Sequence, residues 1–175
     1  GRTLADESPC IDASVDYRVI PREAKADWML AQVRSRLTAR LGKEYTQADK
    51  ATRLELVKQE TIAMQAQIEA MWHILADRGN MSIDQIDEIR QSIIRKVEMR
   101  RRIVWYNQYQ KALTVEKNRD PSPWYQWWLV DESSEGPDLD EFIIEVAEQT
   151  QAHVILPAIS DETANYLLKN QQQFP

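Results

Sequence analysis

The predicted fold depends on residues 46–104, which read TQADKATRLELVKQETIAMQAQIEAMWHILADRGNMSIDQIDEIRQSIIRKVEMRRRIV. Apolar side chains recur there with alternating spacings of three and four residues, which is the pattern of two amphipathic helices joined by a short turn. The first helix carries Leu54, Val57, Thr61, Met64, Ile68, Met71 and Leu75 on one face. The second carries Ile83, Ile86, Ile89, Ile93, Val97 and Val104.

Local signals indicate where these two helices begin and end. The sequence Thr46-x-x-Asp49 is a variant of the capping box, and Ser82-x-x-Gln85 is a second box that opens the next helix. Gly79-Asn80 favours a left-handed C-cap, and Asp120-Pro121-Ser122-Pro123 prevents the second helix from continuing. We therefore predict an antiparallel, coiled-coil-like hairpin of helices 47–78 and 83–117, each about 45 Å long.

Weaker patterns lie on either side of the hairpin. Further helices are expected from Pro21 to Leu41 (with Gly42 as the stop signal), from Asp138, and from Ser160. Short strands are expected at residues 15–20, 124–130 and 153–157. Because an unpaired strand leaves backbone donors unsatisfied, we expect these strands to form one small sheet or to pair with another chain. The predicted fold class is mainly α, a long helical hairpin with a small α+β head of two or three short strands.

Charge divides the chain into three parts, although the net charge of the whole is only −6. Residues 1–20 form an N-terminal extension with a short strand, and residues 1–16 have a net charge of −3. The helical region 21–119 is basic, since residues 17–119 contain 20 basic and 13 acidic side chains. The α+β region 120–175 has one base, Lys169, against 11 acids. Such asymmetry favours attraction within the chain or between subunits, or two different partners.

The composition excludes several classes of function. Only 4 of the 175 residues are glycine, which excludes glycine-rich phosphate loops. One cysteine, Cys10, allows neither an internal disulfide nor a multi-thiolate metal site, and only His73 and His153 could supply imidazole ligands. Glu69 and His73 are one helical turn apart, a spacing that favours a surface ion pair. We therefore expect no cofactor, no metal and no enzymatic activity.

Two groups of residues are candidates for binding a partner. The first is the basic cluster Arg95, Lys96, Arg100, Arg101 and Arg102. Arg100 or Arg101 falls where the apolar seam should continue, so it needs a carboxylate or a phosphate as its partner. A carboxylate of the acidic C-terminal region, from the same chain or a neighbour, is the preferred interpretation, and nucleic-acid phosphate is the alternative. The second group is aromatic: Trp105, Tyr109, Trp124, Trp127 and Trp128, expected in a core or an interface.

The sequence favours a non-enzymatic structural or assembly subunit of a large multi-protein complex, which forms homo- or hetero-oligomers through helical-hairpin and aromatic interfaces. A virus or bacteriophage particle is one setting for such a chain. The first alternative is a nucleic-acid-binding or packaging factor that uses residues 95–102, and the second is a non-catalytic accessory subunit of an enzyme complex. No apolar run is long enough for a membrane span or a signal peptide, so we expect a soluble protein, intracellular or within a particle.

Overall fold

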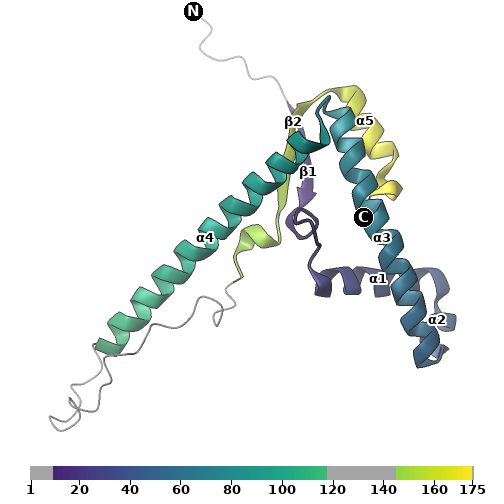
Figure 1. Ribbon diagram of the computed structural model, residues 1–175, viewed down its shortest axis with the longest axis horizontal. Helices are drawn as coiled ribbons and strands as arrows, with labels where there is room; N and C mark the ends of the chain where they lie inside the picture. Colours follow the sequence, from purple (N-terminus) through teal and green to yellow (C-terminus); the bar gives the residue numbers. More distant parts are fainter. Residues whose placement is uncertain (1–9, 118–144, 175) are drawn as a thin grey trace, which may run out of the picture. The chain divides into compact units, whose positions relative to one another are not determined.

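The computed structural model describes residues 10–117 and 145–174, without the side chains of 112–117 and 173. The protein is mainly helical, with one small antiparallel sheet (Figure 1). By its internal contacts the chain divides into two units. The head unit comprises residues 1–94 and 150–175, and the α4 unit comprises residues 95–149.

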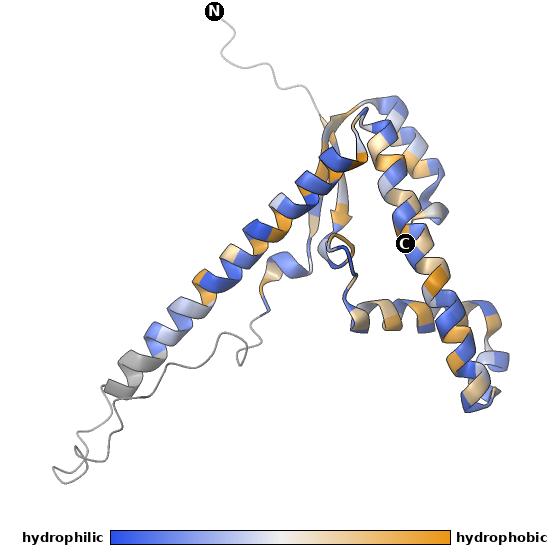
Figure 2. Cartoon of the chain, in the orientation of Figure 1, coloured by the Kyte–Doolittle hydropathy of each residue, from blue (hydrophilic) through white to orange (hydrophobic). Residues whose placement is uncertain are grey.

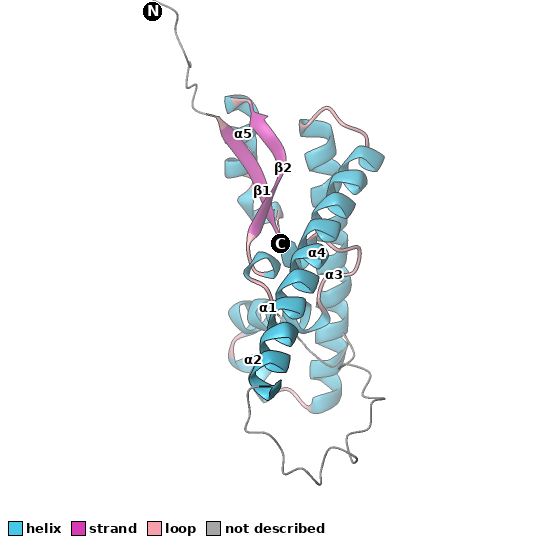
Figure 3. Cartoon of the chain, turned by 90° about the vertical axis from the view of Figure 1, so that its left-hand side faces the viewer, coloured by secondary structure: helices cyan, strands magenta, loops and turns pink. Residues whose placement is uncertain are grey.

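The sheet of the head unit pairs β1 (Ile11–Asp16) with β2 (Ala152–Ile159), as Figure 3 shows. Within the described residues the sheet has two strands. The strand expected at 153–157 is confirmed inside β2, whereas the strand expected at 15–20 is wrong in its boundaries. The chain leaves the extended conformation at Asp16, because the Asp16 carboxylate accepts the Arg18 backbone N–H at 2.9 Å and caps a 3₁₀ turn at Tyr17–Val19. The strand expected at 124–130 lies outside the described residues.

Helix α1 (Ala26–Leu41) begins five residues later than the expected start at Pro21. A helix beginning at Pro21 would use the Ile20 carbonyl for its first backbone hydrogen bond. That carbonyl instead accepts a hydrogen bond of 2.8 Å from the Arg90 side chain. The expected stop is confirmed, since Gly42 has a positive φ of 53° and its N–H bonds to the Thr38 carbonyl. A short helix that the sequence analysis did not predict, α2 (Lys43–Gln47), follows.

Helix α3 (Lys50–Arg78) begins three residues later than the predicted start at residue 47, so the capping box predicted at Thr46 is wrong. Thr46 lies inside α2, and its hydroxyl donates to the Lys43 carbonyl of the same turn. Asp49 is its N-cap, with the Thr52 backbone N–H donating to the carboxylate at 2.9 Å. At the other end Asn80 has a positive φ of 50°, so the asparagine and not Gly79 is the left-handed residue. The N–H of Asn80 bonds to the Asp77 carbonyl and the N–H of Met81 to the Ala76 carbonyl. These two bonds form a Schellman motif, the expected type of helix end.

Helix α4 (Ile83–Lys117) begins at the predicted residue and is helical up to the last residue described before the gap, and its capping box is confirmed. The Ser82 N–H donates to the Gln85 side chain at 2.8 Å, and the Gln85 N–H donates to the Ser82 hydroxyl at 3.2 Å. In the described part of the chain the main helical neighbour of α3 is α1. The fold-back of α3 and α4 into an antiparallel, coiled-coil-like hairpin is therefore not confirmed.

The last elements are short. Helix α5 (Asp161–Lys169) is confirmed at the position expected from Ser160, whose hydroxyl accepts the Thr163 N–H at 3.2 Å. Before β2, residues Ala147–Gln149 form a 3₁₀ turn, and Gln171–Gln173 form another after α5. The beginning of the helix expected from Asp138 lies outside the described residues.

The core of the head unit brings side chains from most of its elements together. Its largest fully buried side chains are Trp72, Ile20, Leu37, Met64, Ile86, Ile155 and Val33. The predicted α3 seam is buried only from Met64 onward, since Leu54 near the N-terminal end is 71% exposed. Arg90, which the sequence analysis did not single out, is 6% exposed and lies on the same face of α4 as Ile86 and Ile93.

Candidate interaction surface on α4

Among the side chains of the α4 unit that the structure describes, three large apolar ones on α4 are exposed. Met99 is 65% exposed, Ile103 is 51% exposed and Tyr106 is 56% exposed. Their spacing of four and then three residues places them on one face of the helix, over two turns. Figure 2 shows hydrophobic positions interleaved with hydrophilic ones along this helix. Exposed apolar side chains that are neighbours on one face indicate an interaction site more strongly than scattered ones do.

Three cations surround this apolar stripe. Arg95, Lys96 and Arg102 are exposed, and with the apolar three they occupy about one third of the helix circumference at 3.6 residues per turn. Among the side chains that the structure describes, in residues 10–111 and 145–174, no carboxylate lies within 4.0 Å of any of these three cations. We define the α4 surface as these six residues: Arg95, Lys96, Met99, Arg102, Ile103 and Tyr106.

The other two members of the predicted basic cluster are ion-paired. The Arg100 Nε lies 2.9 Å from the Glu148 carboxylate, and the Arg101 Nη1 lies 3.6 Å from the Glu98 carboxylate. Glu148 belongs to the acidic region after residue 120, which is the kind of partner that the sequence analysis preferred for an arginine beside the seam. The Arg100 side chain is 65% exposed, so this pair contributes little to stability.

The predicted aromatic group is described only in part. Trp105 and Tyr109 are half-buried and stack one turn apart, with ring centres 5.3 Å apart and ring planes 5° from parallel. Such a pair stabilises the helix surface and keeps two rings in fixed orientation. Trp124, Trp127 and Trp128 lie outside the described residues, so their expected place in a core or interface stays a prediction.

The sequence analysis missed the apolar members of the α4 surface. Met99, Ile103 and Tyr106 are separated by four and three residues, the same spacing that identified the buried seam through Val97 and Val104. Val97 is buried, at 2% exposure. The sequence therefore contained a signal for this surface, namely a second apolar stripe on a helix that already has a buried apolar seam. Two such stripes indicate a helix with apolar contacts on two sides.

Chemistry elsewhere in the described residues is limited. In the ranges 10–117 and 145–174, no three histidine, cysteine or acidic side chains are close enough together to hold a metal ion. Glu69, His73 and Cys10 are all exposed. None of the helices in the described part of the chain is long and apolar enough to cross a membrane.

The head unit has a hollow of about 320 Å³ lined by β1, the 17–19 turn, α1 and α3. Its charged groups already satisfy each other, because Arg18 makes hydrogen bonds of 2.8 and 2.6 Å to the two oxygens of Asp16. The hydrogen bond from Arg18 also lowers the pKa of Asp16 below its ordinary value. A carboxylate held ionised by its own arginine is poorly suited to act as an acid or base near neutral pH.

Comparison with protein-family models, curated proteins and solved structures gave no match for this chain.

Proposed function

We propose that this protein is a non-enzymatic assembly subunit that binds another protein chain through the α4 surface. The observation that carries the proposal is the exposure of Met99, Ile103 and Tyr106 on one face of α4. A stripe with spacings of four and three is the pattern by which an amphipathic helix docks into the apolar groove of a partner. The cations beside it, Arg95 and Arg102, would form the polar rim that interfaces commonly have.

The finer architecture belongs to the same proposal. The turn of Gly79–Ser82 between α3 and α4 supports a hairpin of these two helices, which would be coiled-coil-like once a partner covers α4. The partners would be other subunits of a large complex, copies of this chain or different ones. An intracellular complex and a virus or bacteriophage particle are both compatible settings.

A pair of matched substitutions tests the proposal. Ile103→Asp places a charge inside the α4 surface, whereas Ile62→Asp places the same charge on α3, at a side chain that is 59% exposed. Both substitutions replace an exposed isoleucine, so their effects on folding should be similarly small. Native mass spectrometry of the protein in its natural complex should show that Ile103→Asp removes bound subunits and that Ile62→Asp retains them. Equal retention by both variants would refute the proposal.

Nucleic-acid binding is the second candidate, and the three exposed cations of the α4 surface favour it. If Arg95, Lys96 and Arg102 contact phosphates, affinity should fall steeply with salt, with a log–log slope of about −0.9 for each phosphate neutralised on duplex DNA. Replacing all three with glutamine should then reduce the slope by about two to three. Loss of bound mass on nuclease treatment would favour this candidate over the assembly subunit, whereas partners that survive nuclease would favour the subunit.

A further inference from the structure

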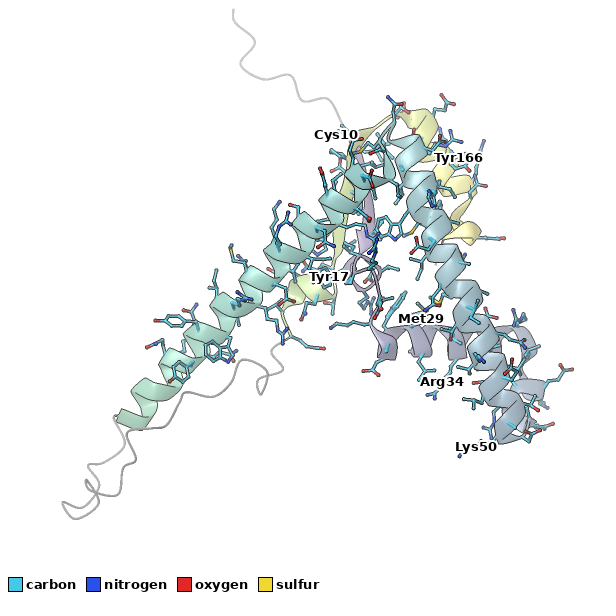
Figure 4. All side chains as sticks on the ribbon, in the orientation of Figure 1. Cys10, Tyr17, Met29, Arg34, Lys50 and Tyr166 are labelled. Atoms are coloured by element: carbon cyan, nitrogen blue, oxygen red, sulfur yellow. The ribbon has the colours of Figure 1, made fainter. Side chains whose placement is uncertain are left out.

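The head unit contains a second hollow, of about 340 Å³, where α5 meets the end of α3. Figure 4 shows Tyr166 on α5 at this place. The hollow is lined by Arg78, Glu162, Asn165, Tyr166, Lys169 and Asn170. Two lining residues are close in sequence to the capped helix ends described above. Arg78 precedes the Schellman motif of α3, and Glu162 follows the Ser160 cap of α5, so these caps fix the backbone beside the hollow.

The Arg78 guanidinium is held in place by an aromatic ring. Its central carbon lies 3.7 Å from the centre of the Tyr166 ring. Stacking covers a face of the planar guanidinium and leaves the N–H groups along its edge available. These groups match the two oxygens of a carboxylate, and an arginine that is already oriented loses less entropy when it binds one.

Within the described residues, no acceptor forms a hydrogen bond with the Arg78 guanidinium. The Arg78 side chain forms neither an ion pair nor a hydrogen bond with the described side chains and backbone of residues 10–111 and 145–174, although Glu162 lines the same hollow. Lys169 is likewise without an ion pair in those ranges. Two cations and one carboxylate leave the hollow with a net charge of +1, which matches a single carboxylate better than a doubly charged phosphate.

We propose that this hollow binds one carboxylate of an acidic peptide segment, with Arg78 as the bidentate donor and Lys169 as the second cation. Asn165 would supply an amide for hydrogen bonding to the peptide backbone. The site lies in the head unit and shares no residue with the α4 surface, so it goes beyond the function proposed above. It predicts that a partner brings an acidic side chain or a C-terminal carboxylate to α5.

The test is a nuclear magnetic resonance titration of the full ¹⁵N-labelled chain with acetyl-Ala-Glu-Ala-amide. We expect shifts of the Arg78 Nε–H and the Asn165 side-chain amide, with a dissociation constant in about the millimolar range for a single charged contact. The isosteric probe acetyl-Ala-Gln-Ala-amide should cause at least about fivefold smaller shifts at the same concentration, because it lacks the charge. Equal shifts with both probes would overturn the proposal, and so would shifts with inorganic phosphate but not with the glutamate peptide.

Three variants separate binding from a purely structural role of the stacked pair. Arg78→Lys keeps the charge and loses the planar fork, so binding should weaken by about tenfold while the fold is retained. Glu162→Gln removes the competing carboxylate and should tighten binding a few fold. Arg53→Lys, at an exposed position in the first turn of α3, is the matched control and should bind like the wild type. Unchanged binding by Arg78→Lys would show that the pair only packs α5 against α3. The variant Ile103→Asp should bind the peptide normally, which distinguishes failure of this site from failure of the α4 surface.

Discussion

Replacing Arg90 with alanine is expected to destabilise the head unit by several kcal/mol, because this side chain connects three segments. Arg90 is 6% exposed, and its Nε donates to the Ile20 carbonyl at 2.8 Å. Its Nη1 lies 2.6 Å from the Asp87 carboxylate one turn earlier on α4. Its guanidinium carbon lies 4.4 Å from the ring centre of Trp72, which is fully buried on α3.

The magnitude follows from these contacts. Truncation leaves the Ile20 carbonyl without its donor, at a cost of about 1–3 kcal/mol. Loss of the desolvated cation–π contact with Trp72 adds about 1–2 kcal/mol. The Asp87 side chain is 41% exposed and regains water, so loss of the ion pair adds at most about 1 kcal/mol. These contributions add to an expected total of about 2–6 kcal/mol.

Urea denaturation followed by tryptophan fluorescence and far-ultraviolet circular dichroism measures this loss. Arg90→Lys retains the charge but loses the planar guanidinium, so its free energy of unfolding should lie between those of the wild type and Arg90→Ala. Arg95→Ala removes an exposed arginine from the same helix and should change stability by less than about 0.5 kcal/mol. If Arg90→Ala destabilised the protein by less than about 1 kcal/mol, or no more than Arg95→Ala, the reasoning would be refuted.

Two further predictions concern the head unit. Leu37→Ala removes a fully buried side chain of α1 and should lower the free energy of unfolding by about 2–5 kcal/mol in the same urea experiment. Because the hydrogen bond from Arg18 lowers the pKa of Asp16, the ionised carboxylate should stabilise the fold at pH values above the ordinary aspartate pKa of 3.8. This contribution should disappear as the pH falls through the lowered pKa. Asp16→Asn should therefore be less stable than wild type at pH 7, by less than about 1 kcal/mol since the pair is about one third exposed, and the difference should shrink below about pH 4. A difference independent of pH between 2 and 7, measured by urea denaturation, would contradict the assigned role of the Arg18 hydrogen bond.

Helix ends set by neighbouring residues could be predicted from the sequence. The start of α4 and the capping box of Ser82 and Gln85 were correct because a cap is completed within four residues. The Schellman end at Gly79-Asn80 was recognised for the same reason, although the left-handed residue is Asn80.

Boundaries that depend on distant contacts were wrong. Val15, Tyr17 and Val19 alternate as a strand would, and all three are buried, but the last two belong to a 3₁₀ turn. Burial alone does not distinguish these conformations, and the hydrogen bond from Arg18 to Asp16 decides between them.

For the candidate sites too, features set by neighbouring residues were predicted and features set by distant contacts were not. The sequence predicted the basic cluster of α4 but not which of its cations would pair, since the partner of Arg100 is Glu148, far along the chain. Neither the apolar part of the α4 surface nor the hollow at Arg78 was predicted. The α4 stripe was visible as periodicity, whereas the contact of Arg78 with Tyr166 joins residues from α3 and α5.

The sequence by itself determined the mainly helical class, the long helices α3 and α4, and the caps at the end of α3 and the start of α4, because these depend on hydrogen bonds and side-chain spacing within a few residues. Only the tertiary structure decided that α3 packs on α1, that α1 begins at Ala26 and that Arg90 is buried. Each of these features requires a contact between distant residues. The Ile20 carbonyl, for example, accepts from an arginine 70 positions away, and no local pattern contains that information.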